Sequence, residues 1–214
     1  MNYFAHGRHF IDDPYFLAGT AVPDWLNVVD RRVRVRSRQA QPHCAATDPR
    51  VAHVAAGIVQ HHRDDDWFHG TRAFAQLSLE LCRRLRDRLP PDESFRPHFL
   101  GHILVEILLD AALIAEAPER LAAYYSAVEQ IDAASVEAAI NGMSTRQVTN
   151  LGVFIGLFSR ERFLWDYLDD GKLLVRLNQV IRRVGLSPLP PVITDVLVES
   201  RQLVSARKDE LLAA

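Results

Sequence analysis

The sequence predicts an all-α fold, and three observations support this class. Apolar residues recur every three or four positions over long segments, which is the helical period. The strict apolar and polar alternation of half-buried strands is nearly absent. The length of 214 residues, with 48% hydrophobic and 24% charged residues, is that of an ordinary globular chain with a sizeable core. We therefore expect residues 1–214 to form a single-domain helical bundle of about eight to ten helices.

The clearest helix is expected over residues 50–69, which carry a well-defined apolar stripe. Thr71 follows as a candidate N-cap, and the next helix covers residues 73–89. The most apolar helix is expected over residues 97–116, and Pro118 suits the first position of the helix after it. Further helices are expected near residues 119–130, 132–141, 145–158, 160–169, 171–185 and 192–211.

The composition argues against several classes of protein. The formal net charge of -2 is too small by itself to indicate a nucleic-acid or membrane partner. The first residues carry acids and lack an uninterrupted apolar stretch, so they do not resemble a signal peptide. No stretch reaches the roughly 18 uninterrupted apolar residues that favour a membrane span. Cys44 and Cys82 lie far apart without a CxxC pair, so we expect no disulfide framework, no thiolate zinc site and a cytoplasmic location.

Three candidate metal ligands, His61, Asp65 and His69, stand four residues apart in the helix expected over residues 50–69. Each step of four rotates about 40° and rises about 6 Å, so neighbouring members share a face. The outer pair lies about 12 Å apart, too far for both to ligate one ion with bonds near 2 Å. Two ions, or one ion with an outlying residue, satisfy this spacing, and Asp65 belongs to either arrangement. The alternative is that this charge-rich run is a solvated helix face.

A second series, His98, His102, Glu106 and Asp110, repeats the spacing of four. The helix that carries it is otherwise almost entirely apolar, so we expect it to be central. A carboxylate on such a helix loses its charge or finds a cation, and imidazoles with carboxylates suit Mn, Fe or Zn. The pair His102 and Glu106 is favoured, with His98 and Asp110 as less certain flanks. The alternative is one narrow exposed stripe on a packed helix.

His6 and Asp24 have aromatic and apolar neighbours in the sequence. A single His or Asp in such surroundings is more often a hydrogen-bonded structural residue than a ligand. Asp24 would also serve as the N-cap of a helix that begins with Trp25. From the residues alone, both side chains stay open between a structural role and a ligand role.

Arginine is concentrated in residues 31–49, which lack an apolar period and predict an extended loop. These arginines are Arg31, Arg32, Arg34, Arg36 and Arg38. Such a run is usually a solvated face. Because the chain is slightly negative elsewhere, this patch would stand out and could receive a phosphate or an acidic protein. The patch is not accompanied by a known nucleic-acid-binding motif or by aromatic residues interspersed among the arginines, so we do not expect nucleic acid as a partner.

Three segments stand out together: MNYFAH, FLAGTAVPDW and GIVQHHRDDDWFH. In this order they resemble the motifs of the acyl carrier protein phosphodiesterase family, distant relatives of the HD-type metal phosphohydrolases. The resemblance places His6, Asp24, His61 and Asp65 at ligand-type positions, and His69 stands where the family has Asp. It covers most of the chain and is most specific in the first 70 residues. The central helix departs from the family, which has an Asp-x3-Asp-His type sequence where this chain has His102, Glu106 and Asp110.

The resemblance implies an HD-like all-α fold and a phosphoric diester hydrolase that removes 4'-phosphopantetheine from holo acyl carrier protein. One or two divalent ions, Mn, Fe or Zn, are implied as cofactors. Spacing and resemblance together give the expected metal ligands His6, Asp24, His61, Asp65, His69, His102 and Glu106. The expected catalytic residues are Asp65, His61 and Glu106. The residues expected to dock the acidic carrier protein are Arg31, Arg32, Arg34 and Arg36.

Two alternatives remain open at this point. One is another HD-like or zinc phospholipase-like hydrolase that acts on a nucleotide or lipid phosphoester. The other is a non-catalytic helical interaction protein. Metal content would separate the second alternative from the hydrolases, and substrate profiling would separate the hydrolases from one another.

Overall fold

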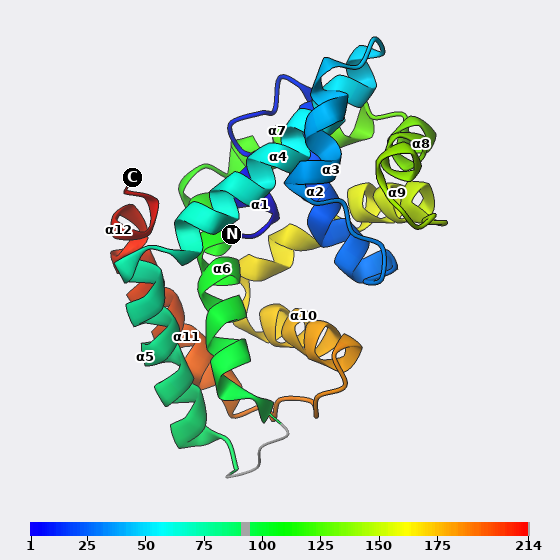
Figure 1. Ribbon diagram of the computed structural model, residues 1–214. Coiled ribbons are helices and arrows are strands. Elements are labelled where there is room, and N and C mark those ends of the chain that lie inside the picture. The colour runs from blue at the N-terminus through cyan, green and yellow to red at the C-terminus, as the bar shows by residue number, and fades with distance from the viewer. Residues whose placement is uncertain (91–94, 214) are drawn as a thin grey trace. The chain divides into compact units, whose positions relative to one another are not determined.

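The computed structural model describes residues 1–90 and 95–213, and these residues form helices joined by turns, without a strand (Figure 1). The expected all-α class is therefore confirmed for the described part of the chain. The chain divides into two compact units. Unit 1 consists of Met1–Asn2, Trp67–Glu116 and Phe163–Ala214, and unit 2 consists of Tyr3–Asp66 and Ala117–Arg162.

Unit 2 is held together by an aromatic core. Trp25, Tyr124 and Phe158 are almost completely buried, and the rings of Trp25 and Phe158 lie 5.3 Å apart in an edge-on contact. The helices of this unit are α1 (Tyr3–Gly7), α2 (Pro14–Val29), α3 (Ser37–Ala40), the 3-10 helix η1 (Gln41–Ala45), most of α4 (Pro49–His69), α7 (Pro118–Glu129), α8 (Ala133–Met143) and α9 (Leu151–Glu161).

Helices α2 and α4 approach each other at a pair of glycines. A Cβ atom on Gly57 would lie 2.2 Å from the backbone oxygen of Phe16 and 2.8 Å from the Cα atom of Gly19. The backbones come this close because neither glycine carries a side chain. Thr20 follows Gly19 on α2, and His61 lies one turn after Gly57 on α4. The contact between glycines therefore brings the backbone of Thr20 within reach of the His61 ring.

Unit 1 is built around α5 (Arg72–Arg88) and α6 (Pro97–Glu116), which lie side by side and also pack against α11 (Ile193–Ala206) (Figure 1). Thr71 is the N-cap of α5, as expected, because its Oγ1 accepts a hydrogen bond from the Phe74 amide at 3.2 Å. A Cβ atom on Gly101 of α6 would lie 2.6 Å from the backbone oxygen of Ser78 on α5. The remaining helices are η3 (Phe163–Leu168), α10 (Asp170–Arg183) and α12 (Lys208–Leu212).

The expected helix over residues 145–158 begins too early. The side chain of Asn141 accepts a hydrogen bond from the Val148 amide at 2.7 Å and donates one to the Val148 carbonyl at 3.0 Å. This contact holds the backbone in a non-helical loop. Asn150 then adopts a left-handed conformation with φ 69°, and α9 starts only after it.

Other expected segments near residues 31–49, 160–169 and 192–211 also differ from those in the structure. No single helix covers residues 160–169: α9 ends at Glu161, Arg162 has a φ of 45°, and the 3-10 helix η3 then covers Phe163–Leu168. The helix expected over residues 192–211 is interrupted at Arg207, which separates α11 from α12. Residues 31–49 contain α3 and η1, so they are not extended throughout.

Among the described helices, α6 is long and apolar enough to pass as a membrane span, with a mean hydropathy of 1.7. However, 61% of its apolar window is buried within the protein. The core helix of a globular protein meets the same criterion, so the composition of α6 is weak evidence for a membrane. The expectation of no membrane span stays a prediction.

Gly57→Ala is expected to destabilise the protein by roughly 1–3 kcal/mol, because the added methyl group meets backbone atoms that cannot move independently. The measurement is the free energy of unfolding from urea denaturation. Gly156→Ala in α9 is the matched control, since no atom lies within 4 Å of the position that a Cβ atom would take there. It is expected to be neutral or stabilising by up to about 1 kcal/mol. Equal effects of the two substitutions would contradict the close approach of α2 and α4.

Candidate metal centres

Among the residues that the structure describes, two groups of side chains could hold a metal ion, and each lies within one unit. Group A, in unit 2, consists of His6, His61 and Asp65. Group B, in unit 1, consists of His69, His102 and Glu106. Within each group the candidate ligand atoms lie within 4.8 Å of one another. His61 and His69 thus belong to different groups, as their spacing along the helix requires.

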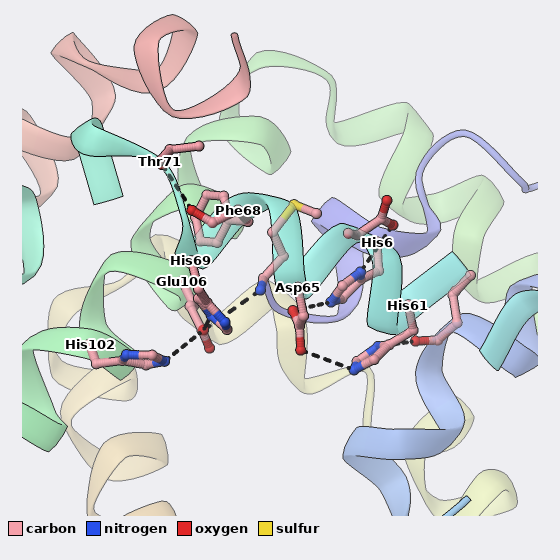
Figure 2. Close-up of polar contacts among 11 residues, drawn as sticks. His6, His61, Asp65, Phe68, His69, Thr71, His102 and Glu106 are labelled. Atoms are coloured by element: carbon pink, nitrogen blue, oxygen red, sulfur yellow. Dashed lines mark hydrogen bonds and ion pairs between the residues drawn. The ribbon is translucent and has the colours of Figure 1, made fainter. Parts of the chain in front are cut away.

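Group A gathers side chains around the carboxylate of Asp65. His6 comes from α1, whereas His61 and Asp65 come from neighbouring turns of α4. His6 Nε2 lies 3.2 Å from Asp65 Oδ1, and His61 Nε2 lies 3.3 Å from Asp65 Oδ2. The two imidazole rings stack with centroids 4.1 Å apart. Figure 2 shows a ring nitrogen of each histidine pointing toward this carboxylate.

The outer nitrogen of each imidazole in group A, the Nδ1 atom that does not face Asp65, also has a hydrogen-bond partner. His61 Nδ1–H donates to the backbone carbonyl of Thr20 at 2.8 Å, because a carbonyl oxygen can only accept. His6 Nδ1 lies 3.3 Å from Asp64 Oδ2, which accepts its proton. Asp64 is itself positioned by Gln60 Nε2, which donates to its other oxygen at 2.7 Å. Metal-binding histidines are held in this way, with the second nitrogen bonded to a carbonyl or a carboxylate.

The charges of group A favour a cation between the two Nε2 atoms and the Asp65 carboxylate. Burial lowers the pKa of His6, but the contacts with Asp64 and Asp65 outweigh it and raise the pKa from 6.5 to about 9. Burial raises the pKa of Asp65, yet contacts with His6 and His61 hold it well below its ordinary value. His6 Nε2 is buried and faces Asp65 Oδ1 at 3.2 Å. A metal ion would take the place of the proton there, so these residues fit a divalent cation.

Group B forms where the end of α4 meets α6. Glu106 Oε1 lies 2.7 Å from His69 Nε2 and 3.2 Å from His102 Nε2. The ring of Phe74 packs 4.8 Å from each of the two imidazoles. Burial raises the pKa of Glu106, but hydrogen bonds from His102 and His69 lower it to about 2. Glu106 is therefore an anion at neutral pH, ready to bind a cation.

The structure leaves three expected or flanking residues outside both groups. Asp24, expected as a metal ligand, is in neither group, and because it lies within α2, whose N-cap is Asp13, the alternative of a capping role is also wrong. His98 is exposed and contacts the guanidinium of Arg86 at 3.2 Å. Asp110 is completely buried, which contradicts the alternative of one exposed stripe along this helix.

Sequence reasoning missed the groups that orient the histidines. Thr20 contacts His61 through its backbone carbonyl, which every residue type has, so the sequence could not identify this partner. Asp64 adjoins Asp65 and was hidden in the acidic run that ends with Asp66. An acid one residue before a ligand is nevertheless a useful signal, because its side chain can reach a histidine from another helix.

The expected docking arginines are exposed. They are Arg31, Arg32, Arg34 and Arg36. Val33 and Val35, which alternate with them, are only 1% and 3% exposed, so the arginines face solvent while the valines anchor the segment. His62 Nε2 donates to the Val35 carbonyl at 3.0 Å and fixes this segment on α4. Arg32 is engaged in an ion pair with Asp30 at 2.9 Å.

Each group offers two imidazole nitrogens and one carboxylate, and neither set selects one metal among Mn, Fe and Zn. The acid and the histidines of each group come from separate helices or separate turns, which only the folded chain brings together. Searches against protein-family models, curated proteins and solved structures find no match for this chain.

In the metal-free protein, the pKa of His6 is expected near 9 rather than near 6.5. Because folding raises this pKa, protonated His6 stabilises the fold fully below about pH 6.5, and the contribution is lost as the pH rises through about 9. Asp64→Asn is expected to lower the pKa of His6, since it removes one of two carboxylates in contact with the ring. NMR titration of the His6 ring protons measures both values. An unchanged pKa in Asp64→Asn would contradict the pairing.

Proposed function

We propose that the protein is a metal-dependent phosphodiesterase with group A as its metal centre. The observation that carries this proposal is the hydrogen bonding of both histidines at their outer nitrogens, which leaves His6 Nε2 and His61 Nε2 directed at Asp65. The motif resemblance supports holo acyl carrier protein as the substrate, with 4'-phosphopantetheine as the released group. His6 lies in MNYFAH, and the other two residues lie in GIVQHHRDDDWFH.

A divalent Mn, Fe or Zn ion bound there would act as a Lewis acid toward phosphate oxygens and would promote the ionisation of water. The protein's own residues prepare the site for it. The Thr20 carbonyl sets the tautomer and orientation of His61, and Asp64 does the same for His6. Asp65 stays ionised at neutral pH because its pKa is lowered, so it supplies a permanent negative charge.

Access to group A is asymmetric. The side chains of His6 and His61 are 0% and 4% exposed, whereas that of Asp65 is 28% exposed. The histidines are therefore shielded from competing water, and a substrate reaches the group from the side of the carboxylate. Water exclusion strengthens the interaction between the charged ligands and a bound ion.

Glu106, expected as a catalytic residue, belongs to group B and not to group A. We assign the hydrolytic role to group A because both of its histidines are held at the outer nitrogen. A role of Glu106 in hydrolysis stays a prediction.

Asp65→Asn is expected to reduce hydrolysis of both holo acyl carrier protein and bis(p-nitrophenyl) phosphate by more than about 100-fold, since it removes the central charge of the site. Rates are measured with metal-loaded protein. Asp66→Asn, the same chemical change at the exposed neighbouring residue, is the control and should retain activity.

Rates of hydrolysis of the carrier protein and of nucleotide and lipid phosphodiesters decide between the proposal and its alternatives. Hydrolysis of nucleotide or lipid phosphodiesters, with the carrier protein left intact, would instead support another phosphoester hydrolase. If the metal-loaded protein hydrolyses none of these substrates, the enzyme proposal is rejected in favour of an interaction protein. Full activity of Asp65→Asn would exclude group A as the catalytic centre.

The double variant Arg34→Ala and Arg36→Ala is expected to raise KM for holo acyl carrier protein by about tenfold, because exposed guanidinium groups attract an acidic partner. Hydrolysis of a small phosphodiester should be unchanged. Arg160→Ala, at an exposed arginine of α9 in the same unit, is the control. Equal losses on the large and the small substrate would refute a docking role for these arginines.

A further inference from the structure

We propose that group B is a second metal site, which binds a zinc-class divalent ion and fastens the end of α4 to α6. Its ligands are His69, His102 and Glu106, and it shares none of them with group A. The inference does not depend on phosphodiesterase activity, because it concerns metal binding within unit 1.

The ligand atoms of group B converge on one point. The Nε2 atoms of His69 and His102 both face the same oxygen of Glu106, at 2.7 and 3.2 Å. Figure 2 shows the two rings approaching this carboxylate from different helices. Two imidazoles with one carboxylate make up the protein ligands of open zinc sites, in which water or another ligand takes a fourth position.

Group B is partly exposed to solvent, and the N-terminal amine of Met1 lies 3.6 Å from Glu106 Oε1. The side chain of His102 is 43% exposed and that of His69 is 33% exposed, whereas Glu106 is only 17% exposed. The carboxylate thus forms the floor of the site and the imidazoles form its rim. An ion held there exchanges with solvent more readily than one in group A, where both imidazoles are buried.

The local packing positions these ligands before any ion binds. Phe74 packs against both imidazole rings, which restricts their rotation. The Thr71 cap fixes the start of α5, the helix that supplies Phe74. The close approach at Gly101 sets the separation of α5 and α6 immediately beside His102. Little conformational entropy remains to be lost on binding, which favours affinity.

The donor atoms define the class of metal. Two of the three are imidazole nitrogens, whereas Mg²⁺ and Ca²⁺ prefer sites made of oxygen ligands. A nitrogen-rich site of this kind suits first-row transition metals, among them Zn²⁺, Fe²⁺ and Co²⁺. Since His69 is the last residue of α4 and the other two ligands lie on α6, the ion would connect two helices and stabilise their contact.

The test is titration of the metal-free, full-length protein with Co²⁺, followed by elemental analysis after gel filtration. His102→Gln and Glu106→Gln are each expected to lose one equivalent of bound Co²⁺ that Asp65→Asn retains. His98→Gln is the matched control, since it removes an exposed imidazole one turn earlier on α6, outside both groups. It should bind as much Co²⁺ as the unaltered protein.

A second readout is thermal stability. Zn²⁺ is expected to raise the Tm of the unaltered protein and of His98→Gln, and to raise it less in His102→Gln. Circular dichroism of the metal-free variants checks their folding. If Glu106→Gln does not fold, His102→Gln decides the outcome, because a residue with a 43% exposed side chain tolerates substitution.

The proposal is overturned if His102→Gln binds as many equivalents of Co²⁺ as the unaltered protein. It is also overturned if His98→Gln loses the same equivalent, since binding would then follow the number of surface imidazoles. Asp65→Asn reports on group A alone. A failure of the proposed hydrolytic function therefore leaves the result for group B readable.

Discussion

The approach of α2 and α4 at Gly19 and Gly57 is the constraint on which group A depends. With no side chain between the two backbones, the Thr20 carbonyl reaches the His61 ring at 2.8 Å. That single hydrogen bond determines which nitrogen of His61 faces Asp65. A packing requirement among uncharged backbone atoms thus sets the chemistry of an ionisable side chain one helical turn away.

The polar atoms of group A are buried in a region that would otherwise favour apolar side chains. Such an arrangement is costly unless each atom has a partner. Asp64 and Thr20 serve the outer nitrogens, and Asp65 serves the inner ones with the help of a proton on His6. The Nδ1 atoms of His6 and His61 are hydrogen-bonded, and both Nε2 atoms face the charged Asp65 carboxylate. This arrangement is the physical basis for proposing a cation site here.

Group B also places a charged carboxylate and two imidazoles together, but their burial and packing differ from those in group A. Its carboxylate is the most buried member, and its imidazoles are partly exposed. The ring of Phe74 restrains the imidazoles, in addition to the hydrogen bond between His69 and Glu106. The same residue types in two settings therefore predict different behaviour. An ion bound to group A would be shielded from solvent, whereas one bound to group B would exchange with solvent more readily.

The sequence by itself determined the all-α class, the extents of α4, α5 and α6, and the separation of His61 from His69, because helical periodicity and rise are local properties. It also singled out His102 with Glu106, since two polar residues one turn apart on an apolar helix need a partner. Spacing could not place His6, which only the motif resemblance suggested, and it wrongly allowed Asp24 to cap a helix that starts at Pro14. Only the tertiary structure assigned His69 to Glu106 and brought Thr20 and Asp64 to the histidines. These contacts join residues from separate helices, so they depend on how closely the backbones pack and not on the order of residues within any one segment.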